Sequence, residues 1–395
     1  MNKVLIKILI ILLFVSSIYS NIIIAVFHVS IFKTLIAVLF IILFSFQFFL
    51  DHKAFKNKQI LILPFLLIVI YILIRPQMGS INLFYTVIFG WVLIQDYDFS
   101  IKIIKITFFI QLGLVFYESF TNTVVYSFIE SGVFAKNKFD YESLNISTVG
   151  FRPKGLFQGT LVASSFVIYL SMIFRNNIKM LYLIFLMSIL VNGRLALLIS
   201  GFILLFKLFK KYDIIIFYKK VNPTKKIFFF LFPFLFFLII LFLVLPSVNL
   251  QNLLNTFNLD STANLGRLYR YVQATLTYLD YDTLSKLIGS TSYEFFDEYG
   301  RVVPAESGLL SMFLDIGLIG VLFYSYYFIK VWRTDRSFIL DLDVKKISFK
   351  FVLVLSLLAF LQYEHINGNL RGILFWFLFL TQLTIDSKNK IRGVN

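Results

Sequence analysis

The sequence contains no cysteine and only three histidines in 395 residues. Without cysteine the chain can form no disulfide, thiolate nucleophile, zinc ribbon or iron–sulfur cluster. His28, His52 and His365 are scattered along the chain, so they offer no histidine metal cluster. We therefore expect a protein that works without a metal or another cofactor.

Charged side chains are also scarce, at 15% of the residues, whereas 59% are hydrophobic and 50 are phenylalanine. A water-soluble fold cannot hide so much apolar side chain behind so few charges. Apolar runs long enough to cross the hydrocarbon of a bilayer recur along the whole chain. In lipid such runs form helices, because each backbone N–H and C=O must find a partner within the segment. The sequence therefore predicts an all-α integral membrane protein, one polytopic domain over 1–395 with about twelve transmembrane helices.

The predicted transmembrane helices lie near 4–27, 31–50, 60–74, 81–95, 101–118, 156–174, 178–193, 195–209, 227–246, 307–330, 348–364 and 371–385. The first apolar run lacks a clear cleavage site, so we interpret it as a span rather than a signal peptide. Two connections on one side are long, at 119–155 and 247–305. The second is the largest soluble segment.

Lysine and arginine are distributed unevenly between the two sides of this predicted topology. Of 37 basic residues, 25 lie at the termini or in the even-numbered connections. By the positive-inside rule this side is cytoplasmic, with both termini inside and the long loops in the periplasm. The net charge of +16 follows from this topology and requires no nucleic acid as a partner. Because the amino-acid usage fits an AT-rich bacterial gene, we expect a multi-pass protein of the bacterial inner membrane.

Arginine is concentrated on the predicted periplasmic side. There it makes up 7 of 12 basic residues, against 4 of 25 on the cytoplasmic side. Lysine would serve equally well as a topology signal, whereas arginine binds phosphate through a planar, permanently charged fork of donors. The outer face is therefore predicted to bind an anion, such as a phosphate or pyrophosphate. The alternative is that these arginines only extend from span ends into water.

Three outer basic residues lie beside glycine at span boundaries. Arg194 occupies the tight turn Val-Asn-Gly-Arg between two spans, and Arg152 and Lys154 precede a span in Gly-Phe-Arg-Pro-Lys-Gly. A cation at such a depth is costly unless it is paired or hydrated. We predict that Arg194 binds phosphate at the mouth of a cavity and that Arg152 and Lys154 add further anion contacts. Membrane-edge positioning without a ligand is the competing interpretation.

The large loop is expected to contain an amphipathic helix near 262–282. Arg267 and Arg270 are three residues apart and share one face of it. The opposite face carries an apolar stripe of Leu265, Leu268, Val272, Leu276 and Leu279. We expect this stripe to rest on the bundle or the membrane surface while the two guanidinium groups face water or a cavity. Arg301, later in the loop, is a further candidate substrate contact.

Glu306 lies where the large loop returns to the membrane, in Pro-Ala-Glu-Ser-Gly-Leu-Leu. As a general base at the boundary, it would gain from partial desolvation, which raises a carboxyl pKa toward neutrality. It could equally be a helix N-terminal cap. Asp315, roughly 13 Å further along a helix, is predicted to be structural.

Four segments in this order resemble the O-antigen polymerase (Wzy-type) family, within the superfamily that also contains the O-antigen ligases. They are Arg152-Pro-Lys-Gly-Leu-Phe, Asn192-Gly-Arg-Leu-Ala-Leu-Leu, Gly266-Arg-Leu-Tyr-Arg-Tyr, and Glu306-Ser-Gly-Leu-Leu through Gly317-Leu-Ile-Gly. The resemblance covers roughly 150–320. In the ligase branch a histidine occupies the position at which this chain has Glu306, a difference that favours the polymerase branch.

The resemblance implies a metal-independent, GT-C-like glycosyltransferase that uses a lipid-linked donor. It would transfer a growing glycan from undecaprenyl pyrophosphate onto the next undecaprenyl-linked repeat unit in the periplasm. It also implies a partner protein that regulates chain length. Three other functions stay open: an O-antigen ligase, a lipid-linked glycan flippase or transporter without covalent chemistry, and a non-enzymatic membrane scaffold.

Overall fold

A computed structural model describes residues 3–18, 66–67, 70–71, 73–74, 78–121, 153, 155–157, 160–191, 193–211, 262–290, 295–296, 302–303, 308–334, 346–362 and 370–391. The spans predicted near 31–50 and 227–246 lie outside these residues, and the span near 60–74 is described only in part. Most of the predicted outer loop 119–155 lies outside them as well.

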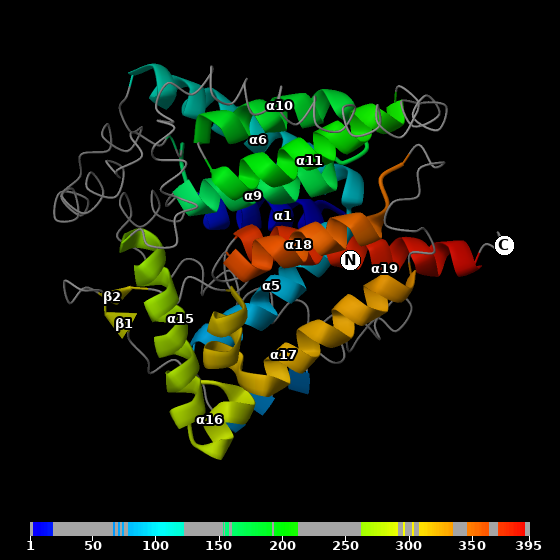
Figure 1. The fold of residues 1–395 in the computed structure, drawn as a ribbon. Coiled ribbons are helices and arrows are strands. Elements are labelled where there is room, and N and C mark those ends of the chain that lie inside the picture. Colours follow the sequence, from blue (N-terminus) through cyan, green and yellow to red (C-terminus); the bar gives the residue numbers. More distant parts are fainter. Residues whose placement is uncertain are drawn as a thin grey trace, which may run out of the picture.

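The described residues are almost entirely helical (Figure 1). Most of the predicted spans correspond to helices: α1 (Lys3–Ile18), α5 (Met78–Gln95), α6 (Tyr97–Thr121), α9 (Thr160–Ile173), α10 (Ile178–Val191), α11 (Arg194–Lys211), α17 (Gly308–Thr334), α18 (Phe349–Gln362) and α19 (Leu370–Ile391). Within the described ranges two of them, α6 and α17, are long and apolar enough to cross a membrane. The helical fold is therefore confirmed, while the number of about twelve spans stays a prediction.

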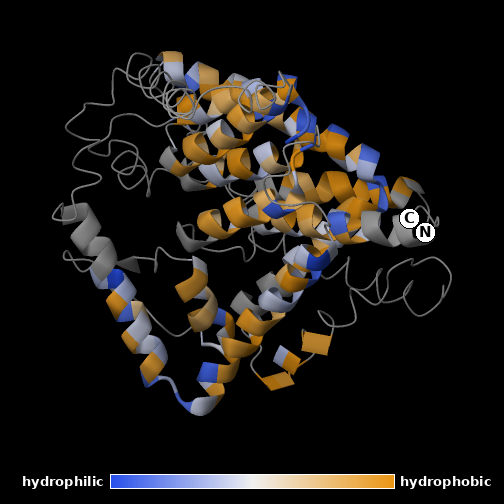
Figure 2. Ribbon diagram, turned by 45° about the vertical axis from the view of Figure 1, so that its right-hand side comes forward, coloured by the Kyte–Doolittle hydropathy of each residue, from blue (hydrophilic) through white to orange (hydrophobic). Residues whose placement is uncertain are grey.

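The large loop contributes the remaining elements. They are α15 (Thr262–Asp280), α16 (Thr283–Ile288) and the strands β1 (Phe295–Phe296) and β2 (Val302–Val303). The two strands are antiparallel, and Phe295 pairs with Val303. Figure 2 shows that α15 mixes hydrophilic and hydrophobic residues, whereas the bundle helices are mostly hydrophobic. This difference is expected for a helix that lies outside the packed bundle.

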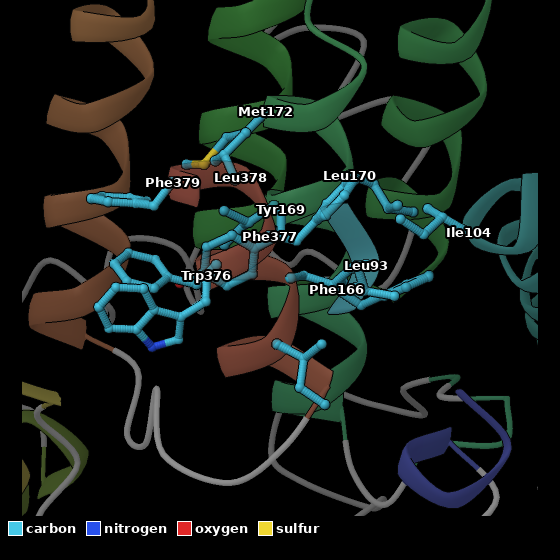
Figure 3. Packing of buried hydrophobic residues seen from close by; sticks show 14 of the residues in the cluster. Leu93, Ile104, Phe166, Tyr169, Leu170, Met172, Trp376, Phe377, Leu378 and Phe379 are labelled. Carbon is cyan, nitrogen blue, oxygen red and sulfur yellow. The ribbon is translucent and has the colours of Figure 1, made fainter. Parts of the chain in front are cut away.

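Runs within two helices, α19 and α9, are buried on all sides and form the centre of the bundle. In α19 every residue from Ile373 to Leu380 is at most 4% exposed, and in α9 the same holds from Ala163 to Met172. Figure 3 shows Tyr169, Trp376 and Phe377 among the side chains packed between these helices. The α19 run is apolar all round and the α9 run is apolar except for three serines, so both are stable only when other helices surround them.

Basic side chains of several helices meet at one end of the bundle. The Nζ atom of Lys210, near the end of α11, donates a hydrogen bond to the carbonyl of Lys346 at 2.9 Å. The guanidinium of Arg175, just after α9, lies 5.1 Å from the ring centre of Phe349 at the start of α18. Basic residues on neighbouring helix ends are Lys102, Lys105, Lys179, Lys330, Arg333 and Lys350. We call this the lysine-rich end.

The span predicted over 307–330 is not one continuous helix. Gly317 interrupts α17 with φ 62° and ψ −165°, which splits it into a short first part ending at Ile316 and a long second part. A Cβ atom at Gly317 would lie 2.5 Å from the backbone nitrogen of Gly289, which follows α16. The break therefore exists because two backbones meet where only glycine fits.

Carbonyl groups at this break are bonded by other parts of the chain. The backbone N–H of Ser290 donates to the Leu314 carbonyl at 2.6 Å. The hydroxyl of Tyr71, a side chain only 1% exposed, donates to the Ile316 carbonyl. Because unpaired carbonyls are costly in an apolar interior, these bonds stabilise the break.

Candidate functional site

The structure describes three of the predicted site residues and the surroundings of the others. Arg194 is the first residue of α11, and Arg267 and Arg270 belong to α15. Arg152, Lys154, Arg301 and Glu306 lie outside the described residues. Described residues lie close to each of them in the chain, at 153, 155, 302 and 308, so the location of each segment can still be compared.

The segment that follows Arg152 is bound to the C-terminal half of α6. The backbone N–H of Gly155 donates to a carboxyl oxygen of Glu118 at 2.7 Å. The next N–H, of Leu156, donates to the side-chain oxygen of Gln111 at 3.0 Å. Helix α9 therefore begins at Thr160, a few residues later than the predicted span, because the preceding residues form a loop bonded to α6.

Apolar side chains anchor the same loop. Pro153 and Leu156 are buried, and Phe157 is only 1% exposed. The ring of Phe157 packs on that of Phe166 in α9, with their centres 4.9 Å apart. We call residues 153 and 155–157 the docked loop, since its backbone is hydrogen-bonded to one helix and its side chains pack on another.

The turn that carries Arg194 meets the beginning of α9. A Cβ atom added to Gly193 would lie 2.8 Å from the Cβ of Ser164, which shows how closely this turn approaches α9. Ser164 lies within the first turns of α9, just after the docked loop. The structure thus brings the segments that follow Arg152 and precede Arg194 to one end of α9, and the lysine-rich end lies at the other.

Helix α15 packs on the first part of α17 through a different face than predicted. Its buried contact is between Ala274 and Leu314, and the Tyr278 ring lies 5.2 Å from that of Phe313. The Tyr278 hydroxyl donates to the Lys286 carbonyl at 3.0 Å, and burial raises the pKa of this hydroxyl.

The described part of the apolar stripe of α15 does not rest on the bundle. Val272, Leu276 and Leu279 are 49%, 53% and 58% exposed. The side chains of Leu265 and Leu268 lie outside the described part. Of the two predicted supports, the bundle and the membrane surface, the bundle does not cover these three residues, and Ala274 forms the buried helix contact instead. Contact of the stripe with the membrane surface stays a prediction.

The packing face of α15 is the one to which position 270 belongs. Arg270 precedes Ala274 by one helical turn, so both lie on the same side of the helix. The Arg270 side chain is half-buried, and position 267 lies one turn earlier on this side. Ala274 on this face packs on the first part of α17, whose helix begins two residues after Glu306.

The segment between α16 and α17 contains two further predicted site residues, Arg301 and Glu306. Arg301 directly precedes β2, and Glu306 lies between β2 and the start of α17. Asp315, which was predicted to be structural, lies 9% exposed beside the break at Gly317. Figure 1 shows α15, the first part of α17 and the beginning of α9 on the same side of the molecule.

Two buried polar residues of α6 are not among the predicted site residues. Gln111 and Glu118 are seven residues apart, two helical turns, and therefore lie on one face of α6. Each is 0% exposed. Their spacing within an apolar span was a usable signal, because polar residues at membrane depth are costly and commonly have a specific partner.

No protein-family model matches this sequence, and neither a curated protein nor a solved structure matches it.

Proposed function

We propose that this chain is a membrane-embedded glycosyltransferase that joins oligosaccharide repeat units carried on undecaprenyl pyrophosphate. This is the activity that its resemblance to the O-antigen polymerase family implies. One observation carries the proposal: the docked loop that follows Arg152 and the turn that contains Arg194 meet at the start of α9. Two arginine-bearing segments that meet at one place suit a pyrophosphate, because arginine can bind phosphate through its planar fork of donors.

The surroundings of Glu306 support the same function. Helix α15, with Arg270 on its packing face, contacts the short helix that begins shortly after Glu306. A carboxylate and several arginines near the outer end of a membrane bundle are suited to the transfer of a glycan from a lipid diphosphate. In this proposal the lysine-rich end is cytoplasmic, both termini are inside, and the reaction occurs at the periplasmic face of the inner membrane.

The proposed reaction is a direct displacement. Glu306 accepts the proton of a sugar hydroxyl on the acceptor repeat unit, and that oxygen forms a bond to the anomeric carbon of the donor. The bond between this carbon and the pyrophosphate oxygen breaks, and undecaprenyl pyrophosphate leaves with the electron pair. Arg194 and Arg267 stabilise the charge that develops on the leaving group. The configuration of the anomeric carbon is inverted.

Other basic residues bind the substrates. Arg152 and Arg270 assist at the diphosphate, and Lys154 and Arg301 contact the donor or acceptor. The substrates are two lipid-linked oligosaccharides held at the membrane surface. A protein that sets chain length is the further partner implied by the resemblance.

The test is polymerisation by the purified protein in lipid vesicles that contain undecaprenyl-pyrophosphate-linked repeat units. We expect Glu306→Gln, Arg194→Ala and Arg267→Ala each to lower the rate of polymer formation about a hundredfold or more. Arg333→Ala is the matched control, because this exposed arginine belongs to the lysine-rich end. Unchanged rates for all three site variants at normal protein levels would end the proposal.

Arg194→Lys separates charge from geometry. Lysine keeps the positive charge but cannot form the planar two-bond contact with phosphate. We expect this variant to recover little of the activity lost in Arg194→Ala. Full recovery would mean that Arg194 acts only as a point charge.

The interruption of α17 favours a second candidate, a lipid-linked glycan flippase. Transporters commonly form their substrate sites from broken membrane helices, and Gly317 breaks this one. A flippase moves lipid-linked repeats between leaflets without joining them. Longer glycan products in the vesicle assay would support the polymerase, whereas transbilayer movement without longer products would support the flippase.

A further inference from the structure

Helix α6 presents two buried hydrogen-bond acceptors to the loop that precedes α9. Gln111 and Glu118 have no solvent exposure, although they lie in a helix apolar enough to cross a membrane. Polar side chains at such a position destabilise the protein unless they are hydrogen-bonded. Both bond the docked loop, and they do so at two successive N–H groups, those of Gly155 and Leu156.

The shape of the docked loop depends on this contact. Gly155 has φ +59°, a conformation that side-chain-bearing residues rarely adopt, and a Cβ atom there would collide with the side-chain oxygen of Gln111. The loop is therefore fitted to α6 in both its hydrogen bonds and its backbone conformation. Pro153, its first residue, directly follows Arg152 in the chain.

We propose that Gln111 and Glu118 are positioning residues for the diphosphate-binding arginines. By holding the docked loop against α6, they fix the chain next to Arg152 at the start of α9, where the turn before Arg194 also packs. Their role in substrate binding rests on the proposed function, whereas their role in docking the loop does not. Neither side chain takes part in bond making or breaking.

Docking can be tested without any assay of activity, because the natural sequence has no cysteine. Leu156→Cys introduces a single thiol at a position that is only 9% exposed. In the full chain in detergent, we expect this thiol to react slowly with a water-soluble maleimide. Glu118→Leu or Gln111→Leu should each raise its labelling rate about tenfold, the effect of losing one hydrogen bond to a buried polar group.

Conservative and neighbouring substitutions supply the controls. Glu118→Gln retains an acceptor oxygen and should leave the labelling rate within about twofold of the parent. Phe120→Leu changes an 81% exposed residue of the same helix and should have no effect. Elution as a single folded species in size-exclusion chromatography is required of every variant, and Gln111→Leu replaces Glu118→Leu if the latter fails. Equal labelling with and without the two acceptors would overturn the docking role.

The consequence for substrate binding is tested in the polymerisation assay. We expect Glu118→Leu to raise the KM for the lipid-linked donor about tenfold while changing kcat by less than about threefold. In the double variant with Arg152→Ala, Glu118→Leu should raise the KM for the donor almost no further, because both substitutions remove the same interaction. Fully additive effects would show that Glu118 does not act through the segment of Arg152.

Failures of the two proposals can be told apart. If the protein forms no polymer and Arg152→Ala has no effect on donor binding, the proposed function fails, although the labelling result still decides whether α6 holds the loop. If polymerisation depends on Arg152 but not on Gln111 or Glu118, only the positioning role is refuted.

Discussion

At the scale of single residues, two small residues determine how closely the Arg194 turn approaches the bundle. Gly193 leaves no room for a Cβ atom beside Ser164, and Ser164 is itself buried. A larger residue at either position would move the start of α11 away from α9. The location of Arg194 thus depends on Gly193, a neighbour that has neither charge nor a functional side chain.

This dependence gives a prediction. Gly193→Ala places a Cβ atom 2.8 Å from that of Ser164, so the turn must shift. We expect a loss of about 1–3 kcal/mol in the free energy of unfolding, typical of an overpacked contact, measured by thermal unfolding in detergent. Adding Ser164→Gly should restore part of that loss, although it alone destabilises α9 slightly. No recovery in the double variant would show that the contact is not the cause.

At the scale of elements, the break in α17 and the position of α16 depend on each other. The first part of α17 ends at Ile316 because α16 and Gly289 occupy the space that a continuous helix would need. In return, the Leu314 carbonyl bonds Ser290 and anchors α16. The two elements form one structural unit, so a change in either should affect both.

Gly317→Ala tests this unit. Its φ of 62° and ψ of −165° are accessible essentially only to glycine, and an added Cβ atom would also meet the backbone of Leu287 at 2.5 Å. We expect a loss of about 3 kcal/mol or more in the free energy of unfolding.

Gly113→Ala is the matched control, because a Cβ atom there, in the middle of α6, meets nothing within 4 Å. It should be neutral or stabilising by about 0.5–1 kcal/mol. Similar losses for the two variants in thermal unfolding would contradict the role given to the break.

The sequence predicts most helices well and the break in α17 not at all. Apolar runs such as 178–193 determine helices by composition alone, and α10 covers Ile178–Val191. The run through Gly317 is equally apolar, and what interrupts it is a contact with Gly289, far from it in the chain. Likewise the partner of Glu118 lies 37 residues away. Local periodicity contains no information about such contacts. The sequence therefore identifies the segments that contain the arginines, but it does not predict that the segments of Arg152 and Arg194 lie close together.

At the scale of the whole molecule, the bundle has two chemically different ends. The lysine-rich end contains basic residues of several helices, and the other holds the docked loop, the Arg194 turn and the α15–α17 contact. A bilayer would separate these ends, since α6 alone, with 25 residues, is about 37 Å long and the hydrocarbon core is about 30 Å thick. By the positive-inside rule, the charge distribution predicts that the lysine-rich end faces the cytoplasm.

This orientation can be tested with single cysteines at the two ends of α6. Asp98→Cys lies at the lysine-rich end and Thr121→Cys at the opposite end, and both positions are exposed. Neither substitution removes a lysine or arginine, so the positive-inside signal is unchanged. In intact spheroplasts, a membrane-impermeant maleimide should label Thr121→Cys at once and Asp98→Cys only after permeabilisation. The reverse pattern would place the arginine segments in the cytoplasm, where a periplasmic polymerase could not use them, and labelling of both positions from outside would show that α6 does not cross the membrane.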